Sequence, residues 1–256
     1  QPDDRLLAVM PLFHINAMFY SVGGACSAGA TVIVAPRFSA STFWQLAAET
    51  RATEVNLIMA ATNILLRRPR SEYAAPVTRE IAAALARDYG IATVIEGFGM
   101  TEIPGAISQP FDGPPVWGAM GRPSLHPDGR VIAEVRIVDE ALRDLPDDVA
   151  GEMLVKTPIV MQGYFRDRDA TAAAFDGEWF RTGDLVRREA DGTLVFVARL
   201  KDIIRRRGEN IAGAELDRGI GEHPDVAECA AIPVPAELGE DDILVAVVPR
   251  TGAALD

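Results

Sequence analysis

The chain has 256 residues, a formal net charge of -12 and a sequence pI of about 4.8. This length allows one large or two modest domains with buried cores, and the acidic balance excludes nucleic acid as an expected partner. The two distant cysteines, Cys26 and Cys229, lack the spacing of a disulfide framework or a zinc site, which favours a reducing compartment such as the cytoplasm. No apolar run reaches the roughly 18 residues of a membrane span.

The first part of the chain, to about residue 112, alternates short apolar runs with helical patterns. It starts without a methionine, so we expect an upstream part to be absent. One predicted helix is capped by Ser41 and reaches about Arg51, and another covers Val77 to Tyr89 and stops at Gly90. Strands are predicted at Leu6 to Met10, Ala30 to Ala35, Glu54 to Ala60 and Ala92 to Glu96. This alternation predicts an α/β fold with a mostly parallel, helix-covered sheet.

After about Gly113, glycine, proline and aspartate turns separate β-rich runs, which predicts a small antiparallel sheet or barrel. A basic loop from Lys201 then precedes one helix and two strands. The predicted elements are strands Val131 to Asp139, Met153 to Lys156, Leu185 to Arg188 and Leu194 to Val197, with a turn at Ala190-Asp191-Gly192, then helix Ala212 to His223 and strands Val226 to Ile232 and Ile243 to Val248. Little chain follows, so we expect this last piece to be an unfinished domain.

The strongest local signal is the segment Gly97-Phe98-Gly99-Met100-Thr101-Glu102, which follows a predicted strand. Glycines allow a ligand to approach the backbone, and the aromatic ring offers a stacking face. Thr101 can donate to a phosphate, and Glu102 can bind a hard cation. A nucleotide would use all of these groups. From these six residues alone, an ordinary strand-to-helix turn capped by Thr101 is an equal alternative.

Two later segments carry polar groups of a related kind. In Arg181-Thr182-Gly183-Asp184-Leu185, the carboxylate beside a glycine turn can accept two hydrogen bonds from vicinal ribose hydroxyls. Taken alone, Asp184 would more often cap a turn. The stretch from Arg199 to Ile211, taken alone, would be a solvated basic loop. The joint order of these segments along the chain favours the functional interpretation.

Five blocks together resemble the successive core motifs of the adenylate-forming superfamily, which includes acyl-CoA synthetases, peptide-synthetase adenylation domains and luciferases. The blocks cover nearly the whole chain: Pro11-Leu12-Phe13-His14, Phe98 to Glu102, Gly121-Arg122-Pro123, Arg181 to Leu185 and Arg199 to Ile211. The resemblance implies a partial adenylate-forming fold. Residues 1–200 would form the C-terminal part of the large domain, with a β-rich subdomain from about 113, and residues 201–256 would begin the small mobile domain.

The resemblance also implies a nucleotide site. Phe98 would stack on adenine, Thr101 would bind the α-phosphate and Glu102 would hold Mg2+. Asp184 and Arg199 would bind the ribose hydroxyls. The residues that contact ATP or AMP would be Ala75, Pro76, Gly97, Phe98, Gly99, Met100, Thr101, Asp184 and Arg199.

Three further residues would serve the acyl and coenzyme A steps. His14 would lie beside the acyl pocket. A histidine whose hydrogen bonds are satisfied at the start of a helix is an equal alternative. Lys201 would lie at the hinge about which the small domain rotates, and Gly208 would line the path of the pantetheine thiol. The catalytic set would then be His14, Thr101, Glu102 and Lys201. No protein nucleophile is expected, because a mixed anhydride with AMP is already a reactive electrophile.

The implied function is AMP-forming acyl-CoA synthesis from a small-molecule carboxylate, ATP, Mg2+ and coenzyme A. Two alternatives are transfer to a carrier-protein pantetheine and a noncatalytic AMP-binding remnant. Within the CoA-ligase branch, the chain is most similar to crotonobetaine/carnitine CoA ligases at His14-Ile15-Asn16, Phe43-Trp44 and Arg206 to Asn210. A homodimer is compatible with the sequence.

Some positions depart from the family pattern. Phe98 replaces a common tyrosine, and Ala198 and Arg207 replace frequent glycines. The family's phosphate-cradling loop would lie upstream of residue 1 and its C-terminal lysine beyond residue 256, and neither Lys156 nor Lys201 is placed to substitute for that lysine. We therefore expect the chain by itself not to adenylate a carboxylate.

Overall fold

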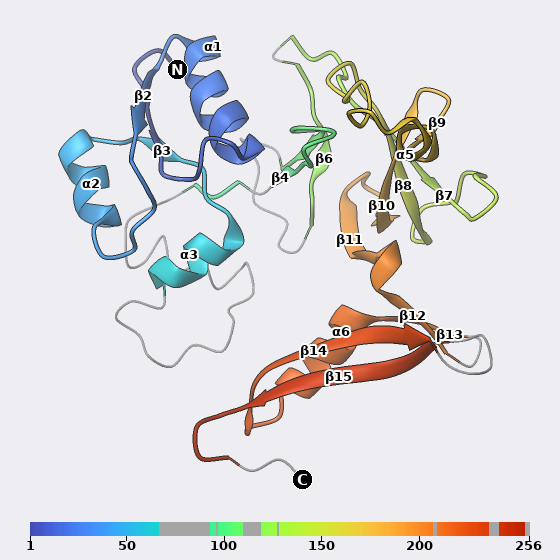
Figure 1. Ribbon diagram of the computed structural model, residues 1–256. Coiled ribbons are helices and arrows are strands. Elements are labelled where there is room, and N and C mark those ends of the chain that lie inside the picture. Colours follow the sequence, from blue (N-terminus) through green and yellow to red (C-terminus); the bar gives the residue numbers. More distant parts are fainter. Residues whose placement is uncertain are drawn as a thin grey trace. The chain divides into compact units, whose positions relative to one another are not determined.

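The computed structural model describes residues 1–66, 93–95, 97–109, 119–126, 128–206, 209–235 and 241–253 (Figure 1). The chain divides into two compact units, each described by itself below. The first comprises Gln1–Ser124 and Thr157–Gly163, and the second comprises Leu125–Lys156 and Tyr164–Asp256. The helix predicted over Val77 to Tyr89 lies outside the described residues.

The first unit is built on a three-stranded parallel sheet in the order β2-β1-β3. The central strand β1 (Arg5–Ala8) pairs with β2 (Thr31–Val34) on one side and β3 (Glu54–Val55) on the other. Leu7 of β1 is fully buried, as expected for a central parallel strand whose two faces are both covered. The prediction of a parallel sheet is confirmed.

Among the described residues of this unit, four helices connect or follow these strands (Figure 1). They are η1 (Asn16–Gly23), α1 (Gly24–Ala28), α2 (Phe43–Thr50) and α3 (Met59–Leu66). The helix η1 is a π-helix, a rare form that occurs mostly as single turns and frequently at functional sites. Helix α2 confirms the helix predicted in this region. Its cap prediction is wrong, because Thr42 is the N-cap residue and the Ser41 hydroxyl lies 3.1 Å from that of Ser39.

Two of the strand predictions in this unit are also wrong in extent. Strand β3 ends at Val55, and the apolar residues that follow enter α3, where Ala61 and Leu65 are buried at helical spacing. A short apolar run does not distinguish a strand from a helix by periodicity alone. Residues 93–95 form no strand, and the next strand begins only at Gly97.

The hydrophobic core of the first unit includes residues from β1, η1, α2 and α3. The buried residues of this cluster are Leu7, Val9, Met10, Ala17, Phe43, Ala61 and Leu65. The Phe43 ring packs edge to face on the Trp44 ring, with 4.8 Å between their centroids. The Phe43–Trp44 pair is therefore part of the core.

A second, smaller sheet in this unit has the order β4-β5-β6 and is antiparallel. It consists of β4 (Gly97–Phe98), β5 (Ile107–Ser108) and β6 (Arg122–Pro123). Gly121, just before β6, has a φ of 109°, and a Cβ there would overlap the backbone of Ser108. Glycine at this position therefore permits the close approach of β5 and β6.

The second unit contains an antiparallel sheet in the order β11-β10-β8-β7, with β9 paired to β10. Its strands are β7 (Glu134–Val138), β8 (Ala150–Lys156), β9 (Phe175–Asp176), β10 (Trp179–Arg188) and β11 (Leu194–Arg199). Between β10 and β11, Gly192 has a φ of 84°, and the Asp191 carboxylate accepts a hydrogen bond from the Thr193 N–H at 2.9 Å. The predicted antiparallel sheet and its hairpin turn are confirmed.

Further elements of this unit follow β11 (Figure 1). They are η2 (Leu200–Asp202), β12 (Ile203–Arg206), β13 (Glu209–Ala212), α6 (Gly213–Gly221), β14 (Val226–Pro235) and β15 (Asp241–Pro249). Helix α6 packs on β14, where the Asp217 carboxylate accepts a hydrogen bond from the Ala231 N–H at 2.6 Å. The helix and both strands predicted here are confirmed, while a separate domain from residue 201 stays a prediction.

Helix α5 (Arg168–Ala173), also in the second unit, offers a test of local stability. The Asp167 side chain caps it by accepting a hydrogen bond from the Ala170 N–H at 2.9 Å. Replacing Asp167 with alanine should lower the free energy of unfolding by about 1 kcal/mol, whereas asparagine keeps a capping oxygen and should change it little. Urea unfolding would measure the free energy of unfolding of both variants. Equal losses of stability with alanine and with asparagine would contradict the capping role of Asp167.

Across the described parts of the chain, none of the helices combines the length and the apolar character that crossing a lipid bilayer requires.

Candidate functional site

The candidate residues fall into two groups, one in each unit. His14 and the segment Gly97 to Glu102 belong to the first unit, and Asp184, Arg199 and Lys201 belong to the second. The structure brings Asp184 and Arg199 into contact. The other predicted residues, Ala75, Pro76 and Gly208, lie outside the described residues.

The segment from Gly97 to Glu102 runs from β4 into a tight loop. The backbones of Met100 and Ile103 exchange hydrogen bonds of 3.2 and 3.4 Å, and β5 begins a few residues later. The loop therefore connects two strands, and the alternative in which Thr101 caps a helix is wrong. Thr101 is exposed at the loop, whereas Glu102 is half-buried and its carbonyl accepts a hydrogen bond from the Met161 N–H at 2.7 Å.

Close packing explains the second glycine of this segment. A Cβ at Gly99 would lie 2.7 Å from the Tyr20 hydroxyl and 2.8 Å from the Gly105 nitrogen. The Gly105 N–H donates a hydrogen bond to that hydroxyl, and burial raises the pKa of Tyr20 above its usual value. Tyr20 was not predicted, because its contact joins residues far apart in the sequence and leaves no periodic signal.

His14 lies immediately before η1 and is exposed. Its carbonyl accepts a hydrogen bond from the Met18 N–H at 3.1 Å, and its ring centroid lies 4.5 Å from that of Phe13. Two residues later, the Asn16 Oδ1 is buried with no hydrogen-bond partner among the described residues. An acceptor of this kind is uncommon in folded proteins and is available to a ligand donor.

Asp184 is the most unusual carboxylate of the second unit. Its side chain is fully buried on β10, directly opposite Arg199 on β11, whose Nε lies 2.9 Å from Oδ1. Neither carboxylate oxygen accepts a well-directed hydrogen bond from any residue that the structure describes. The side chain therefore does not cap a turn, and its two oxygens retain unused capacity to accept hydrogen bonds.

The charge state of Asp184 follows from the same environment. Burial raises its pKa to about 6, although the Arg199 guanidinium acts in the opposite direction. At neutral pH the carboxylate is therefore ionised, with Arg199 as its charged neighbour but without the well-directed hydrogen bonds that a buried anion requires. Two vicinal hydroxyls, as on a ribose, are donors of the right number and chemistry.

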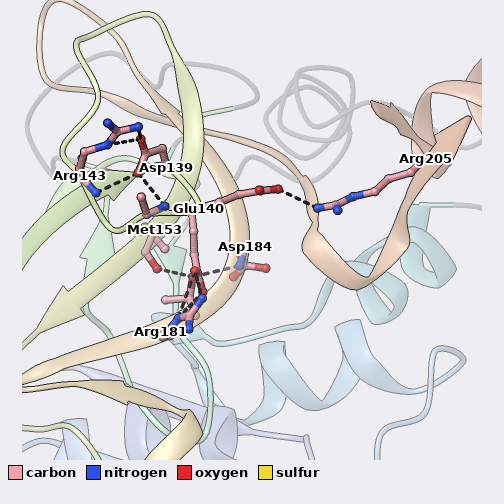
Figure 2. A network of polar contacts seen from close by, with 10 residues as sticks. Asp139, Glu140, Arg143, Met153, Arg181, Asp184 and Arg205 are labelled. Atoms are coloured by element: carbon pink, nitrogen blue, oxygen red, sulfur yellow. Dashed lines mark hydrogen bonds and ion pairs between the residues drawn. The ribbon is translucent and has the colours of Figure 1, made fainter. Parts of the chain in front are cut away.

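Lys201 lies exposed in the short helix η2, between β11 and β12. Nearby, the Arg205 guanidinium donates to Glu140 at 2.9 Å (Figure 2). The Arg205 N–H donates to the Asp241 carboxylate at 2.8 Å. Both side chains of the Arg205–Glu140 ion pair are exposed, so this pair contributes little to stability. Lys201 itself remains a predicted hinge residue.

Within the described ranges, no group of three or more histidine, cysteine, aspartate or glutamate side chains is arranged to hold a metal ion. Mg2+ commonly binds through one or two carboxylates, with phosphate oxygens and water completing its coordination. Glu102 fits the role of such a single carboxylate.

The chain resembles CoA ligases over its whole length. It is 37% identical to a sulfoacetate–CoA ligase of Cupriavidus necator (strain ATCC 17699 / DSM 428 / KCTC 22496 / NCIMB 10442 / H16 / Stanier 337), over 100% of this chain and 51% of that protein. It is 33% identical to an oxalate–CoA ligase of Arabidopsis thaliana, over 98% of this chain and 51% of that protein. The chain thus spans about half the length of the curated relatives it matches.

The fold agrees with these matches. The ATP-bound structure of MatB from Rhodopseudomonas palustris superposes with a TM-score of 0.85 at 29% identity, covering 100% of this chain and 52% of that one. The fold is therefore that of an adenylate-forming enzyme, as predicted. Residues 1–165 match the family model described as AMP-binding enzyme. The chain belongs to the AMP-binding enzyme family.

Proposed function

We propose that the full-length protein is an AMP-forming acyl-CoA synthetase, which activates a carboxylate with ATP and transfers the acyl group to coenzyme A. The observation that carries this proposal is the buried Asp184 carboxylate, paired with Arg199 and lacking hydrogen-bond donors, in a chain of the AMP-binding family. The CoA-ligase names of its relatives support the reaction class.

In the first half-reaction, a carboxylate oxygen attacks the α-phosphorus of ATP. The bond from that phosphorus to the oxygen that bridges it to the β-phosphate breaks, so that an acyl-adenylate forms and pyrophosphate leaves. Phe98 would stack on the adenine, and Ala75 and Pro76 would lie against it. Asp184 would accept hydrogen bonds from the ribose hydroxyls, with Arg199 beside it. Nucleotide binding at these positions would orient the phosphorus for attack.

The exposed hydroxyl of Thr101 would donate to an α-phosphate oxygen, where negative charge grows as the carboxylate attacks. A Mg2+ ion, when bound, would offset charge on the phosphate oxygens. Glu102 is the residue proposed to hold it, next to Thr101 on the same loop.

Glu102→Gln should raise the Mg2+ concentration needed for half-maximal ATP binding about tenfold or more, because one charge-assisted contact is lost. AMP binding without metal should change little. Calorimetric titration of ATP at several Mg2+ concentrations would measure the effect, with Glu49→Gln at an exposed position of α2 as the matched control. An unchanged Mg2+ requirement would rule out Glu102 as the metal ligand.

In the second half-reaction, the coenzyme A thiolate attacks the acyl carbonyl carbon, the anhydride bond breaks and AMP leaves. His14 would contact the acyl group, Lys201 would act as the hinge and Gly208 would line the thiol path. The small C-terminal domain that begins near residue 201 would move between the two steps. The same chemistry with a carrier-protein pantetheine is the alternative acceptor reaction.

The identity of the thiol acceptor can be tested directly. The full-length protein would be incubated with ATP, Mg2+ and a panel of carboxylates that includes sulfoacetate, oxalate, medium-chain acids and carnitine. Thioester formed with free coenzyme A would support the proposal. Thioester formed only on a holo carrier protein would favour the alternative. AMP binding without turnover on any acid would favour a noncatalytic AMP-binding protein.

The finer assignment to a crotonobetaine/carnitine-like subtype is part of this proposal, and its support is limited to few residues. Phe43 and Trp44 pack in the core, so the presence of this pair carries no information about which substrate is bound. The assignment therefore rests on Ile15-Asn16 beside His14 and on the segment from Arg206. Carnitine turnover in the same panel would test it.

A cytoplasmic location is supported by the two free cysteines, Cys26 and Cys229. A homodimer stays a prediction, which light scattering of the purified protein would check.

A further inference from the structure

Strand β10 carries an irregularity at the position of Asp184. Arg181 pairs with Leu154 of β8, and Leu185 pairs with Glu152, so β10 advances four residues while β8 advances two. The extra residues belong to the segment Thr182-Gly183-Asp184, which contains a glycine with a φ of 68°. The segment is a β-bulge, a feature that redirects side chains and is common beside active sites.

A bidentate ion pair spans this bulge. Arg181, just before the bulge, donates from Nε and Nη2 to the Glu152 carboxylate, with the shortest contact at 2.6 Å. Glu152 lies opposite Leu185, the first paired residue after the bulge, and is only 8% exposed. These hydrogen bonds raise the pKa of Arg181 above its usual value. The pair therefore fixes the two ends of the bulge relative to each other.

Inside the bulge, Thr182 forms hydrogen bonds to Met153 and Asp184, two residues that Figure 2 labels. Its buried hydroxyl donates to the Met153 carbonyl at 2.8 Å and accepts from the Asp184 N–H at 3.1 Å. Met153 is the residue of β8 that the bulge passes over. On the other side, Arg199 donates to the Thr182 carbonyl at 3.3 Å and lies beside Asp184. Asp184 is thus held through its backbone, while its carboxylate remains without donors.

We propose that Arg181 and Glu152 are positioning residues for Asp184: their bidentate ion pair holds the β-bulge that presents the Asp184 carboxylate to the ribose of the nucleotide. The proposal rests on the proposed function for the identity of the ligand. A glutamate in a strand would ordinarily be expected to face water, and here it is buried because the guanidinium of Arg181 satisfies its charge.

The test separates positioning from stability by using two kinds of variant of the full-length protein. Glu152→Gln and Arg181→Met each break the pair. The double variant Glu152→Met/Arg181→Met removes both charges and fills the buried space of Glu152 with apolar atoms. Arg181 is 41% exposed, so the stability to be recovered is mainly that lost when the buried Glu152 carboxylate is left unpaired. The matched control is Lys156→Met, which breaks the exposed Lys156–Glu178 pair on the same strand β8.

Each variant would be characterised by urea unfolding and by calorimetric titration with AMP. The single variants should be less stable and bind AMP about tenfold or more weakly. The double variant should regain stability but not AMP affinity, because the apolar pair lacks the directed hydrogen bonds that fix the bulge. The control should retain both properties. Recovery of AMP affinity together with stability would overturn the proposal, as would wild-type affinity in either single variant.

A ligand-free measurement keeps this test independent of the nucleotide assignment. The Asp184 carboxyl, with Arg199 as its charged neighbour, can be titrated by NMR after carbon-13 labelling of aspartate. If the pair holds the bulge, the titration midpoint of Asp184 should move in the double variant and stay constant in Lys156→Met. A midpoint unchanged in the double variant would overturn the proposal. If neither the wild type nor any variant bound AMP, the nucleotide assignment would fail. The titration of Asp184 would then decide by itself whether Arg181 and Glu152 position this residue.

Discussion

Replacing Asp184 with asparagine should weaken AMP binding about tenfold to a hundredfold while raising the melting temperature of the nucleotide-free protein at neutral pH. The loss of affinity follows because charge-assisted hydrogen bonds contribute on the order of 1.5–3 kcal/mol each. The gain in stability follows because the cost of burying the Asp184 charge outweighs its attraction to Arg199, so that removing the charge is favourable. Its partner Arg199 is 38% exposed and stays hydrated when Asp184 is neutralised.

The free energy of unfolding should also depend on pH, because the buried Asp184 carboxyl gains or loses its charge as the pH changes. The pKa of Asp184 is about 6 in the folded protein and 3.8 for an ordinary aspartate, so the folded state binds the proton more tightly. Between these values the free energy of unfolding therefore falls as pH rises, and the full penalty is present above pH 6. The difference between wild type and Asp184→Asn should grow across this window and then level off.

Calorimetric titration with AMP and thermal unfolding from pH 4 to 8 would measure these effects. Asp169→Asn, an exposed aspartate in the first turn of α5, is the matched control and should change neither AMP affinity nor the pH profile appreciably. Unchanged AMP affinity in Asp184→Asn would contradict the ribose assignment. Lower stability of that variant at neutral pH would contradict the account of the buried charge.

Gly121→Ala should lower the free energy of unfolding by about 3 kcal/mol, because it combines a left-handed backbone with a steric overlap. The φ of Gly121 is 109°, and a Cβ would overlap backbone atoms of Ser108, which cannot move aside as a flexible side chain could. The strain would act on β5 and β6, and β5 pairs with Phe98 of β4. We therefore also expect weaker AMP binding.

Gly129→Ala provides the matched control for this prediction. Gly129 also has a positive φ, 85°, but a Cβ there would meet no atom within 4 Å. Its replacement should lower the free energy of unfolding by only about 1 kcal/mol, which reflects the backbone conformation alone. Urea unfolding of both variants would measure the difference. Equal destabilisation would show that the close approach of β5 and β6 is not what requires glycine at position 121.

Much of the fold could be predicted because its signals are local. The apolar run at Leu6 and the Asp191-Gly192 turn each determine their own backbone conformation, and both elements form where the sequence predicts them. The run after Glu54 was assigned wrongly because its short apolar segment suits a strand or a helix equally. The π-helix η1 gives no periodic signal that separates it from an α-helix.

The candidate site was predicted only in part, for a related reason. Asp184 was found because a carboxylate follows a glycine in a motif, but its burial and its missing donors depend on the bulge in β10. Tyr20 and Glu152 were missed because each acts through a partner far away in the sequence, Gly99 and Arg181. A single sequence does not reveal such pairs, which become visible only when the strands and loops are placed in space.

The central claim, that the protein adenylates a carboxylate, is tested most directly by carboxylate-dependent exchange of labelled pyrophosphate into ATP by the full-length protein. Exchange should require Mg2+ and one class of carboxylate, should proceed without coenzyme A, and should fall strongly in Asp184→Asn. Absence of exchange with every acid of the panel, from a protein that still binds AMP, would contradict the claim.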